Sequence, residues 1–186
     1  MDAPRTKKQL TELDRPSPAA YASTEKIPLC LVLDDIRSAN NVGSLFRTAD
    51  GFALQHLYLC GITATPPHRD ILKTALGATA TVNWSYHEDC AVLVRELAGG
   101  GAQVRCLEQT VGSVALTDFR ATRPFPLVLV VGNEVNGVHQ DVIDAAHGTI
   151  EITQYGTKHS LNVAVSAGMA IWEISRQIRA HPADQR

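Results

Sequence analysis

Long apolar runs are missing from this sequence. Although 45% of its 186 residues are hydrophobic, they form no stretch of 18 or more, and a membrane-spanning helix needs about 20. The first residues, MDAPRTKKQLTELDRPSP, also lack the apolar core of a secretory signal peptide. We therefore expect a cytoplasmic protein that does not enter a membrane.

Cysteine is scarce, and the four cysteines are scattered. No CxxC pair occurs, so the ligand spacing of a structural zinc site is absent, and we expect no bound metal. Cys30 and Cys60 lie in apolar, strand-like runs, where a thiol usually serves as a small hydrophobic side chain.

The charge balance gives no general sign of a nucleic-acid binder, because the formal net charge is −2. Two short basic stretches, RTKK near the start and RQIR near the end, leave binding through a local patch open.

Strand-like and helix-like segments alternate along the chain from residue 27 onward. This alternation predicts one α/β domain, a mostly parallel sheet covered by helices on both faces, over residues 27–186. Residues 1–26 are polar and contain proline, and we expect an N-terminal arm there. The expected strands are 29–36, 56–61, 81–86, 102–108, 125–134 and 149–153. The expected helices are 40–53, 71–78, 88–98, 140–147 and a long final one from near Ser160 to about Ala180.

The first strand leads into DDIRSANNVGSLFRTAD (34–50), which is unusually polar for a segment that opens a helix. Asn40 or Asn41 could cap this helix. Arg47 lies further inside, between apolar neighbours, so it either pairs with a carboxylate such as Glu134 or faces an anionic ligand. Both interpretations remain open from the spacing alone.

A second polar segment, VVGNEVNGV (130–138), follows the strongest strand signal. Glycine at position 132 would let a ligand approach the main chain closely. The pattern is neither GxGxxG nor GxxxxGKS, so it does not predict a nucleotide-phosphate cradle of the usual kind.

The third segment is YGTKHSLNV (155–163), in front of the final helix. Ser160 could cap that helix. Asn162 then falls inside the helix, where asparagine has poor propensity, which suggests a functional reason for it.

Taken together, these segments resemble a known family. N-x-G-x-x-x-R (41–47), G-N-E-x-x-G (132–137) and S-L-N-V (160–163), in this order, are similar to the three motifs of the SpoU/TrmH branch of the SPOUT RNA methyltransferases. ILKTALGA (71–78) is similar to a further segment of that family. The resemblance covers about residues 27–180 and leaves out the arm.

The resemblance implies an enzyme that transfers a methyl group from S-adenosylmethionine to a ribose 2′-hydroxyl of tRNA or rRNA. It also implies a C-terminal deep trefoil knot, formed by segments 130–138 and 152–162, and a homodimer that buries the start of the last helix and completes the active site. Physical argument alone would not propose a knot, since knots are rare.

The same resemblance suggests which residues form the site. Its catalytic and substrate-positioning set corresponds to Asn41, Arg47, Glu134, Ser160 and Asn162, and its cofactor contacts to Leu107, Gly132, Ile152, Ser160 and Leu161. One departure is Thr153, where the family usually has proline, so the rigidity of that loop is in question.

Two other functions are consistent with parts of the pattern. A non-catalytic RNA-binding or assembly factor on the same fold would keep the glycines but lose the polar set, which this chain retains. A doubly wound nucleotide-dependent oxidoreductase would need a glycine fingerprint after the first strand, and DDIRSANNVG lacks one.

Overall fold

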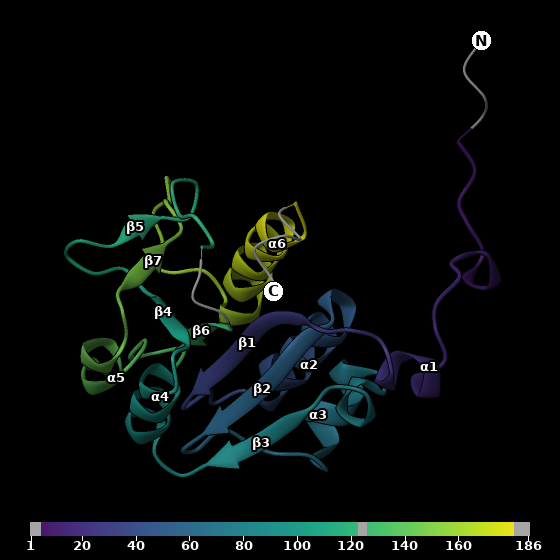
Figure 1. Cartoon of the computed structure of the whole chain (residues 1–186), viewed down its shortest axis with the longest axis horizontal. Coiled ribbons are helices and arrows are strands. Elements are labelled where there is room, and N and C mark those ends of the chain that lie inside the picture. Colours follow the sequence, from purple (N-terminus) through teal and green to yellow (C-terminus); the bar gives the residue numbers. More distant parts are fainter. Residues whose placement is uncertain (1–4, 123–125, 181–186) are drawn as a thin grey trace.

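The computed structural model describes residues 5–122 and 126–180 and contains one seven-stranded sheet. All strand pairs are parallel, in the order β3-β2-β1-β6-β4-β7-β5 (Figure 1). The strands are β1 Ile27–Asp34, β2 Leu54–Cys60, β3 Trp84–His87, β4 Gln103–Leu107, β5 Val114–Ala115, β6 Leu127–Val131 and β7 Thr149–Glu151. The predicted parallel α/β sheet is thereby confirmed, and the trefoil knot stays a prediction.

The helices cover the sheet on both faces. They are α1 Pro18–Ala22, α2 Ala39–Phe52, α3 Arg69–Ala75, α4 Cys90–Gly99, α5 Gln140–Ala145 and α6 Val163–Ala180, with short 3-10 turns at Leu10–Glu12 and Ala78–Ala80. Side chains of α2, α3 and α6 share one core cluster with the sheet, and those of α4 and α5 share the other.

The two central strands show why the sheet forms where it does. β6 is buried at every position, and β1 at every position but one. A strand covered on both faces needs apolar side chains on both, so its sequence is a continuous apolar run. Residues Leu29–Leu33 pair in register with Leu127–Val131, which places the ends of these two strands, and the polar loops after them, side by side.

The cysteines are buried and free, as small hydrophobic side chains would be. Burial raises the pKa of the Cys30 and Cys106 thiols to about 12, so both stay protonated. The apolar role expected for Cys30 and Cys60 is confirmed.

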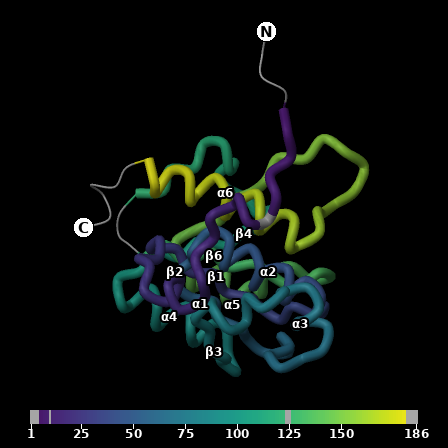
Figure 2. Tube along the Cα trace, turned by 90° about the vertical axis from the view of Figure 1, so that its right-hand side faces the viewer, coloured from purple at the N-terminus to yellow at the C-terminus, as the bar shows by residue number. Residues whose placement is uncertain are grey.

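Two features differ from the sequence expectations. Strand β5 was not expected, because two residues carry no periodic signal. The final helix begins at Val163, not near Ser160, and the segment before it makes a wide excursion (Figure 2). The residues YGTKHSLNV are compatible both with an extended segment in front of the helix and with its first turn.

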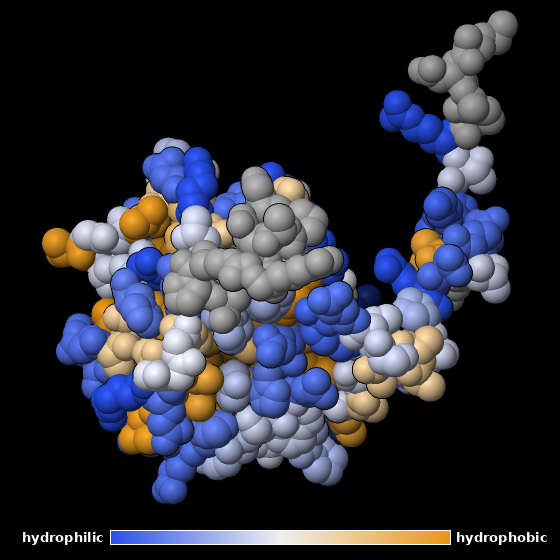
Figure 3. All heavy atoms as spheres, viewed as in Figure 1, coloured by the Kyte–Doolittle hydropathy of each residue, from blue (hydrophilic) through white to orange (hydrophobic). Residues whose placement is uncertain are grey.

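The N-terminal segment projects from the body and is largely hydrophilic (Figure 3). Its helix α1 is attached to the domain by the Tyr21 hydroxyl, which donates to the main-chain oxygen of Asp50 across 2.8 Å. Within the described residues, no helix combines the length and the apolar composition that crossing a membrane requires.

Candidate active site

A cavity of about 490 Å³ opens beside the C-terminal ends of β4, β6 and β7. In parallel sheets, ligands bind beyond this edge of the strands. Three segments line the cavity: the end of β4, the loop after β6 and the chain from Ile150 to Ser166. The structure brings together all the residues expected to contact a cofactor: Leu107, Gly132, Ile152, Ser160 and Leu161.

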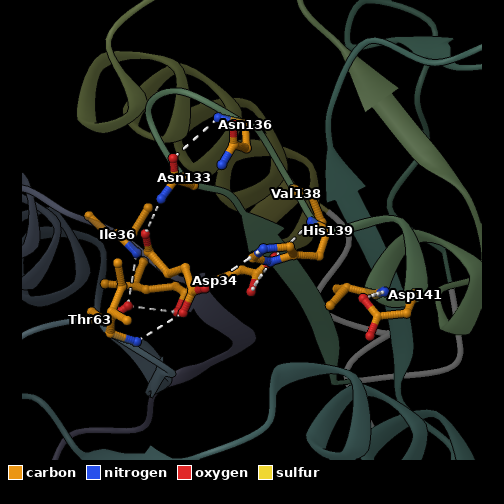
Figure 4. Close-up of polar contacts among 12 residues, drawn as sticks. Asp34, Ile36, Thr63, Asn133, Asn136, Val138, His139 and Asp141 are labelled. Atoms are coloured by element: carbon orange, nitrogen blue, oxygen red, sulfur yellow. Dashed lines mark hydrogen bonds and ion pairs between the residues drawn. The ribbon is translucent and has the colours of Figure 1, made fainter.

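The loop after β6 owes its shape to Asn133, whose side chain is buried. Its Oδ1 accepts from the amides of Val135 (2.9 Å) and Asn136 (3.2 Å), and its Nδ2 donates to the main-chain oxygen of Asp35 (2.7 Å) (Figure 4). The first two bonds close the turn, and the third attaches it to the end of β1. Asn133 was not among the site residues expected from the sequence, although it is the N of the G-N-E motif.

Asp34 and His139 hold the far end of this loop. The buried carboxylate of Asp34 accepts from the His139 amide (2.9 Å), and the His139 Nδ1 lies 3.0 Å from its Oδ2 (Figure 4). This hydrogen bond, with the Asp34 charge, raises the pKa of His139. Together with Asp35, these residues place carboxylate oxygen and imidazole nitrogen atoms within 4.8 Å of one another. Hydrogen bonds to one another and to nearby main-chain amides already engage these atoms, so the group holds the loop in place.

The loop itself gives a reason for glycine at position 132, in addition to the expected approach of a ligand. A Cβ there would collide with the main chain of Gly137 and Val138. The close approach that requires glycine is therefore the loop's own return, and a larger residue would displace the loop as well as any ligand.

The Glu134 carboxylate lies at the edge of the cavity and accepts three hydrogen bonds. The donors are the amides of Arg37 (2.9 Å) and Ser38 (3.1 Å) and the side-chain amide of Asn41 (2.8 Å). Burial alone would raise the pKa of Glu134, but these donors outweigh it and the pKa is lowered. Glu134 is thus a charged group that fixes the entrance to α2.

Asn41 connects this carboxylate to the start of α6. Its Oδ1 accepts from the Nδ2 of Asn162 across 3.2 Å. Ser38, not an asparagine, caps α2, because its hydroxyl accepts from the Asn41 amide (3.3 Å). The capping role considered for Asn40 or Asn41 is therefore wrong.

Asn162 does cap a helix, contrary to its expected place inside α6. Its Oδ1 accepts from the amides of Ala164 (2.9 Å) and Val165 (3.2 Å). Ser160 lies two residues earlier, exposed on the cavity wall, and makes no hydrogen bond within residues 5–122 and 126–180. The cap expected of Ser160 is wrong, and its hydroxyl is free to meet a ligand.

Arg47 lies apart from this group. It is exposed and borders a second hollow, between α2 and α3, rather than the cavity. The alternative of an Arg47–Glu134 salt bridge is wrong, because Glu134 is occupied by the three donors from residues 37–41. Of the expected catalytic set, the structure joins Asn41, Glu134 and Asn162 directly, places Ser160 on the same cavity and leaves Arg47 on the outer side of α2.

Comparisons with known proteins bear on this arrangement. Residues 28–172 match the SpoU rRNA Methylase family. The chain belongs to this family. The match includes all three polar segments and every residue that lines the cavity.

Individual SpoU relatives cover a similar stretch. The 23S rRNA (guanosine-2'-O-)-methyltransferase RlmB of Neisseria meningitidis is 30% identical over 150 residues, which are 81% of this chain and 59% of that protein. The tRNA (guanosine(18)-2'-O)-methyltransferase of Aquifex aeolicus is 28% identical over 80% of this chain and 69% of its own length. This chain thus spans less than two thirds of the length of the Neisseria relative.

Solved structures agree on the fold. The TrmH/SpoU tRNA modifying enzyme of A. aeolicus superposes with a TM-score of 0.78 at 25% identity, over 89% of this chain and 83% of that one. An AdoMet-bound rRNA methyltransferase from Sinorhizobium meliloti gives a TM-score of 0.76 at 25% identity, over 88% and 62% of the two chains.

Proposed function

We propose that this protein is an S-adenosylmethionine-dependent RNA methyltransferase that modifies a ribose 2′-hydroxyl of tRNA or rRNA. The observation that carries the proposal is the hydrogen-bonded chain Glu134–Asn41–Asn162, which joins the three polar motifs at one cavity. Its relatives named above are ribose 2′-O-methyltransferases of rRNA and tRNA.

The cavity suits S-adenosylmethionine in size and lining. A volume of about 490 Å³ lies in the range of small-molecule sites, roughly 300–1,000 Å³. Leu107, Ile152 and Leu161 offer apolar contact for an adenine ring, and the main chain around Gly132 offers polar contact. When bound, S-adenosylmethionine supplies an activated methyl group.

The polar chain would position the substrate rather than remove its proton. A carboxylate that already accepts three hydrogen bonds, and whose pKa is lowered, is a weak base. Glu134 would therefore hold Asn41 in place, Asn41 would hold Asn162, and the free hydroxyl of Ser160 would contact the ligand. Rate acceleration would come mainly from orientation of the ribose hydroxyl.

Arg47 would act on the RNA side of the reaction. Its exposed guanidinium has no carboxylate partner among the described residues, so it can bind a backbone phosphate next to the reacting ribose. Arginine stays protonated because its pKa exceeds about 12, so we assign Arg47 phosphate binding alone, and the hydroxyl proton would pass to the bound phosphate or to solvent.

The assembly that we propose is a homodimer joined along α6. The side of this helix away from the sheet exposes Val165 (54%), Met169 (45%) and Trp172 (55%), and Tyr155 beside it is 95% exposed. They line an open apolar hollow of about 1020 Å³. Exposed apolar surface of this kind marks protein–protein contacts, and a second copy of α6 would cover it.

The proposal is tested by cofactor binding and methyl transfer together. Calorimetry should show binding of S-adenosylmethionine but not of NAD, the ligand of the oxidoreductase alternative. Leu161→Trp fills the cavity from an exposed position and should abolish that binding, whereas Leu72→Trp, exposed on α3, should not. The protein should then transfer tritiated methyl groups to total RNA from cells that lack it. Cofactor binding unaffected by Leu161→Trp, or no transfer to any RNA, would contradict the proposal.

A further inference from the structure

A second hollow, of about 590 Å³, lies between α2 and α3, and Arg47 is one of the residues that line it. Seven residues of the two helices line it, together with Leu76, which directly follows α3: Ser44, Arg47, Thr48, Gly51, Phe52, Lys73 and Thr74. The two helices pack closely, since a Cβ at Gly43 would collide with Thr74 and Ile71. The hollow is therefore a fixed feature of two packed helices.

Two cations border this hollow, and neither has an anionic partner. Arg47 and Lys73 are both exposed, and within residues 5–122 and 126–180 neither side chain forms a hydrogen bond or an ion pair. Some other basic side chains are engaged: Arg176 pairs with Glu173 at 2.7 Å, and Arg179 donates to a main-chain oxygen at 3.1 Å. Two unpaired cations at one depression repel each other and favour an anion between them.

The hydroxyl groups in the hollow present acceptors rather than donors. The hydroxyls of Ser44 and Thr74 both donate to the main-chain oxygen of Asn40 (2.9 and 3.0 Å), and that of Thr48 donates to the oxygen of Ser44 (3.0 Å). Because their protons are already used, their oxygens offer lone pairs to a ligand that can donate. A ribose 2′-hydroxyl is such a donor, and it distinguishes RNA from DNA.

The position of the hollow relates it to the cavity. Arg47 follows Asn41 by six residues on α2, which corresponds to about 9 Å along the helix axis. Asn41 reaches the cavity through Glu134 and Asn162. A polynucleotide whose reacting ribose lies at the cavity would extend along α2 past this hollow.

We propose that the hollow between α2 and α3 binds the ribose–phosphate backbone of RNA beside the reacting nucleotide, and that Lys73 is a positioning residue for that RNA. The inference rests on the proposed function and adds a contact that lies outside the catalytic set. Lys73 and Arg47 hold the phosphate from opposite helices, and the oxygens of Ser44 and Thr48 accept from the ribose.

This inference is tested by steady-state kinetics of the Lys73→Met variant, with RNA from cells lacking the protein as the substrate. Methionine keeps the apolar stem and removes the charge, so the apparent KM for RNA should rise about five- to tenfold while kcat stays within about twofold. The logarithmic salt slope of RNA binding should fall by about one, and Lys73→Arg should restore both. Arg95→Met, exposed on α4 on the opposite face of the sheet, is the matched control and should change neither.

The ribose contact has its own test. Ser44→Ala removes one acceptor and should raise the KM for RNA about two- to threefold. Inhibition by a single-stranded DNA competitor should be unchanged in this variant, because DNA lacks the 2′-hydroxyl.

The outcomes separate this inference from the function on which it rests. An active wild type whose KM and salt slope are unchanged by Lys73→Met would overturn the RNA contact and leave the enzyme intact. A fall in kcat without a change in KM would also overturn it, because a residue that only positions RNA would not have that effect. A wild type that methylates no RNA would overturn the proposed function, and the inference with it.

Discussion

The side chains of Asn162 and Asn41 meet across 3.2 Å, although 121 positions separate them in the chain. Asn162 does two things at once: its Oδ1 caps α6, and its Nδ2 donates to Asn41. Asn41 in turn donates to Glu134. The start of α6, the start of α2 and the loop after β6 are thereby held in one arrangement at the cavity.

The two roles of Asn162 can be separated by substitution. Asn162→Asp keeps an oxygen for the cap but replaces the donor to Asn41 with a second acceptor, so stability should be retained while methyl transfer falls at least tenfold. Asn162→Ala loses both roles and should also cost about 1 kcal/mol of unfolding free energy, the usual contribution of a cap. Thermal melts and single-turnover methylation measure the two effects. Full activity of the aspartate variant would show that the Asn41 contact is dispensable.

Glu134 should make stability depend on pH. The pKa of Glu134 is lowered in the folded state, so the Glu134 carboxylate adds to the free energy of unfolding above the ordinary glutamate pKa of about 4.3. This contribution is lost as the pH falls through the lowered pKa. Glu134→Gln should therefore be less stable near neutral pH by about 1 kcal/mol, allowing for partial solvent screening. The difference should shrink in acid, as chemical denaturation at a series of pH values would show. A constant difference would mean that the charge plays no part.

Gly168 tests the dimer without disturbing the protomer. A Cβ at this position would meet no atom within 4 Å in the described structure, yet Gly168 borders the apolar hollow on α6. Gly168→Leu should leave the melting temperature of the protomer unchanged or raise it, because leucine favours helix by up to about 1 kcal/mol over glycine, and it should weaken dimerisation. Light scattering measures the effect, with Gly99→Leu on α4 as a control. A wild type that is monomeric at micromolar concentration would refute the dimer.

Arg47→Lys keeps the charge and loses the planar, two-pronged geometry for phosphate. Single-turnover methylation should fall about 100-fold, the order expected when a reacting group is misplaced by about 1 Å. Affinity for S-adenosylmethionine should be unchanged because Arg47 does not line the cavity, and so should the melting temperature, because no carboxylate pairs with it in the described residues. Near-normal turnover with a lowered melting temperature would assign Arg47 a structural role.

The sheet could be predicted from the sequence because a strand buried on both faces needs an unbroken apolar run. Leu29–Leu33 and Leu127–Val131 are such runs, and they pair at the centre of the sheet. The start of α6 could not be predicted in the same way. Ser160 and Asn162 are both good capping residues, and the choice between them depends on Asn41, which the chain brings there from another segment.

The residues of the site were identified by their motifs, but their connections were not. A salt bridge between Glu134 and Arg47 was one of two interpretations that the sequence left open, yet the Glu134 carboxylate accepts from two main-chain amides at the entrance to α2 instead. Every residue except proline carries an amide N–H, so no sequence pattern distinguishes those two. For Gly132 the sequence suggested only the approach of a ligand. The return of the loop at Gly137, which a Cβ at position 132 would strike, is visible only in three dimensions.

Methyl transfer to a ribose hydroxyl at this cavity can be observed by nucleoside mass spectrometry. RNA from cells lacking the protein is incubated with S-adenosylmethionine and either wild-type protein or Leu161→Trp, then digested to nucleosides. We predict 2′-O-methylated nucleosides with the wild type and none above background with the variant whose cavity is filled. Methyl groups on the bases instead of the ribose, or equal 2′-O-methylation by both proteins, would contradict the account.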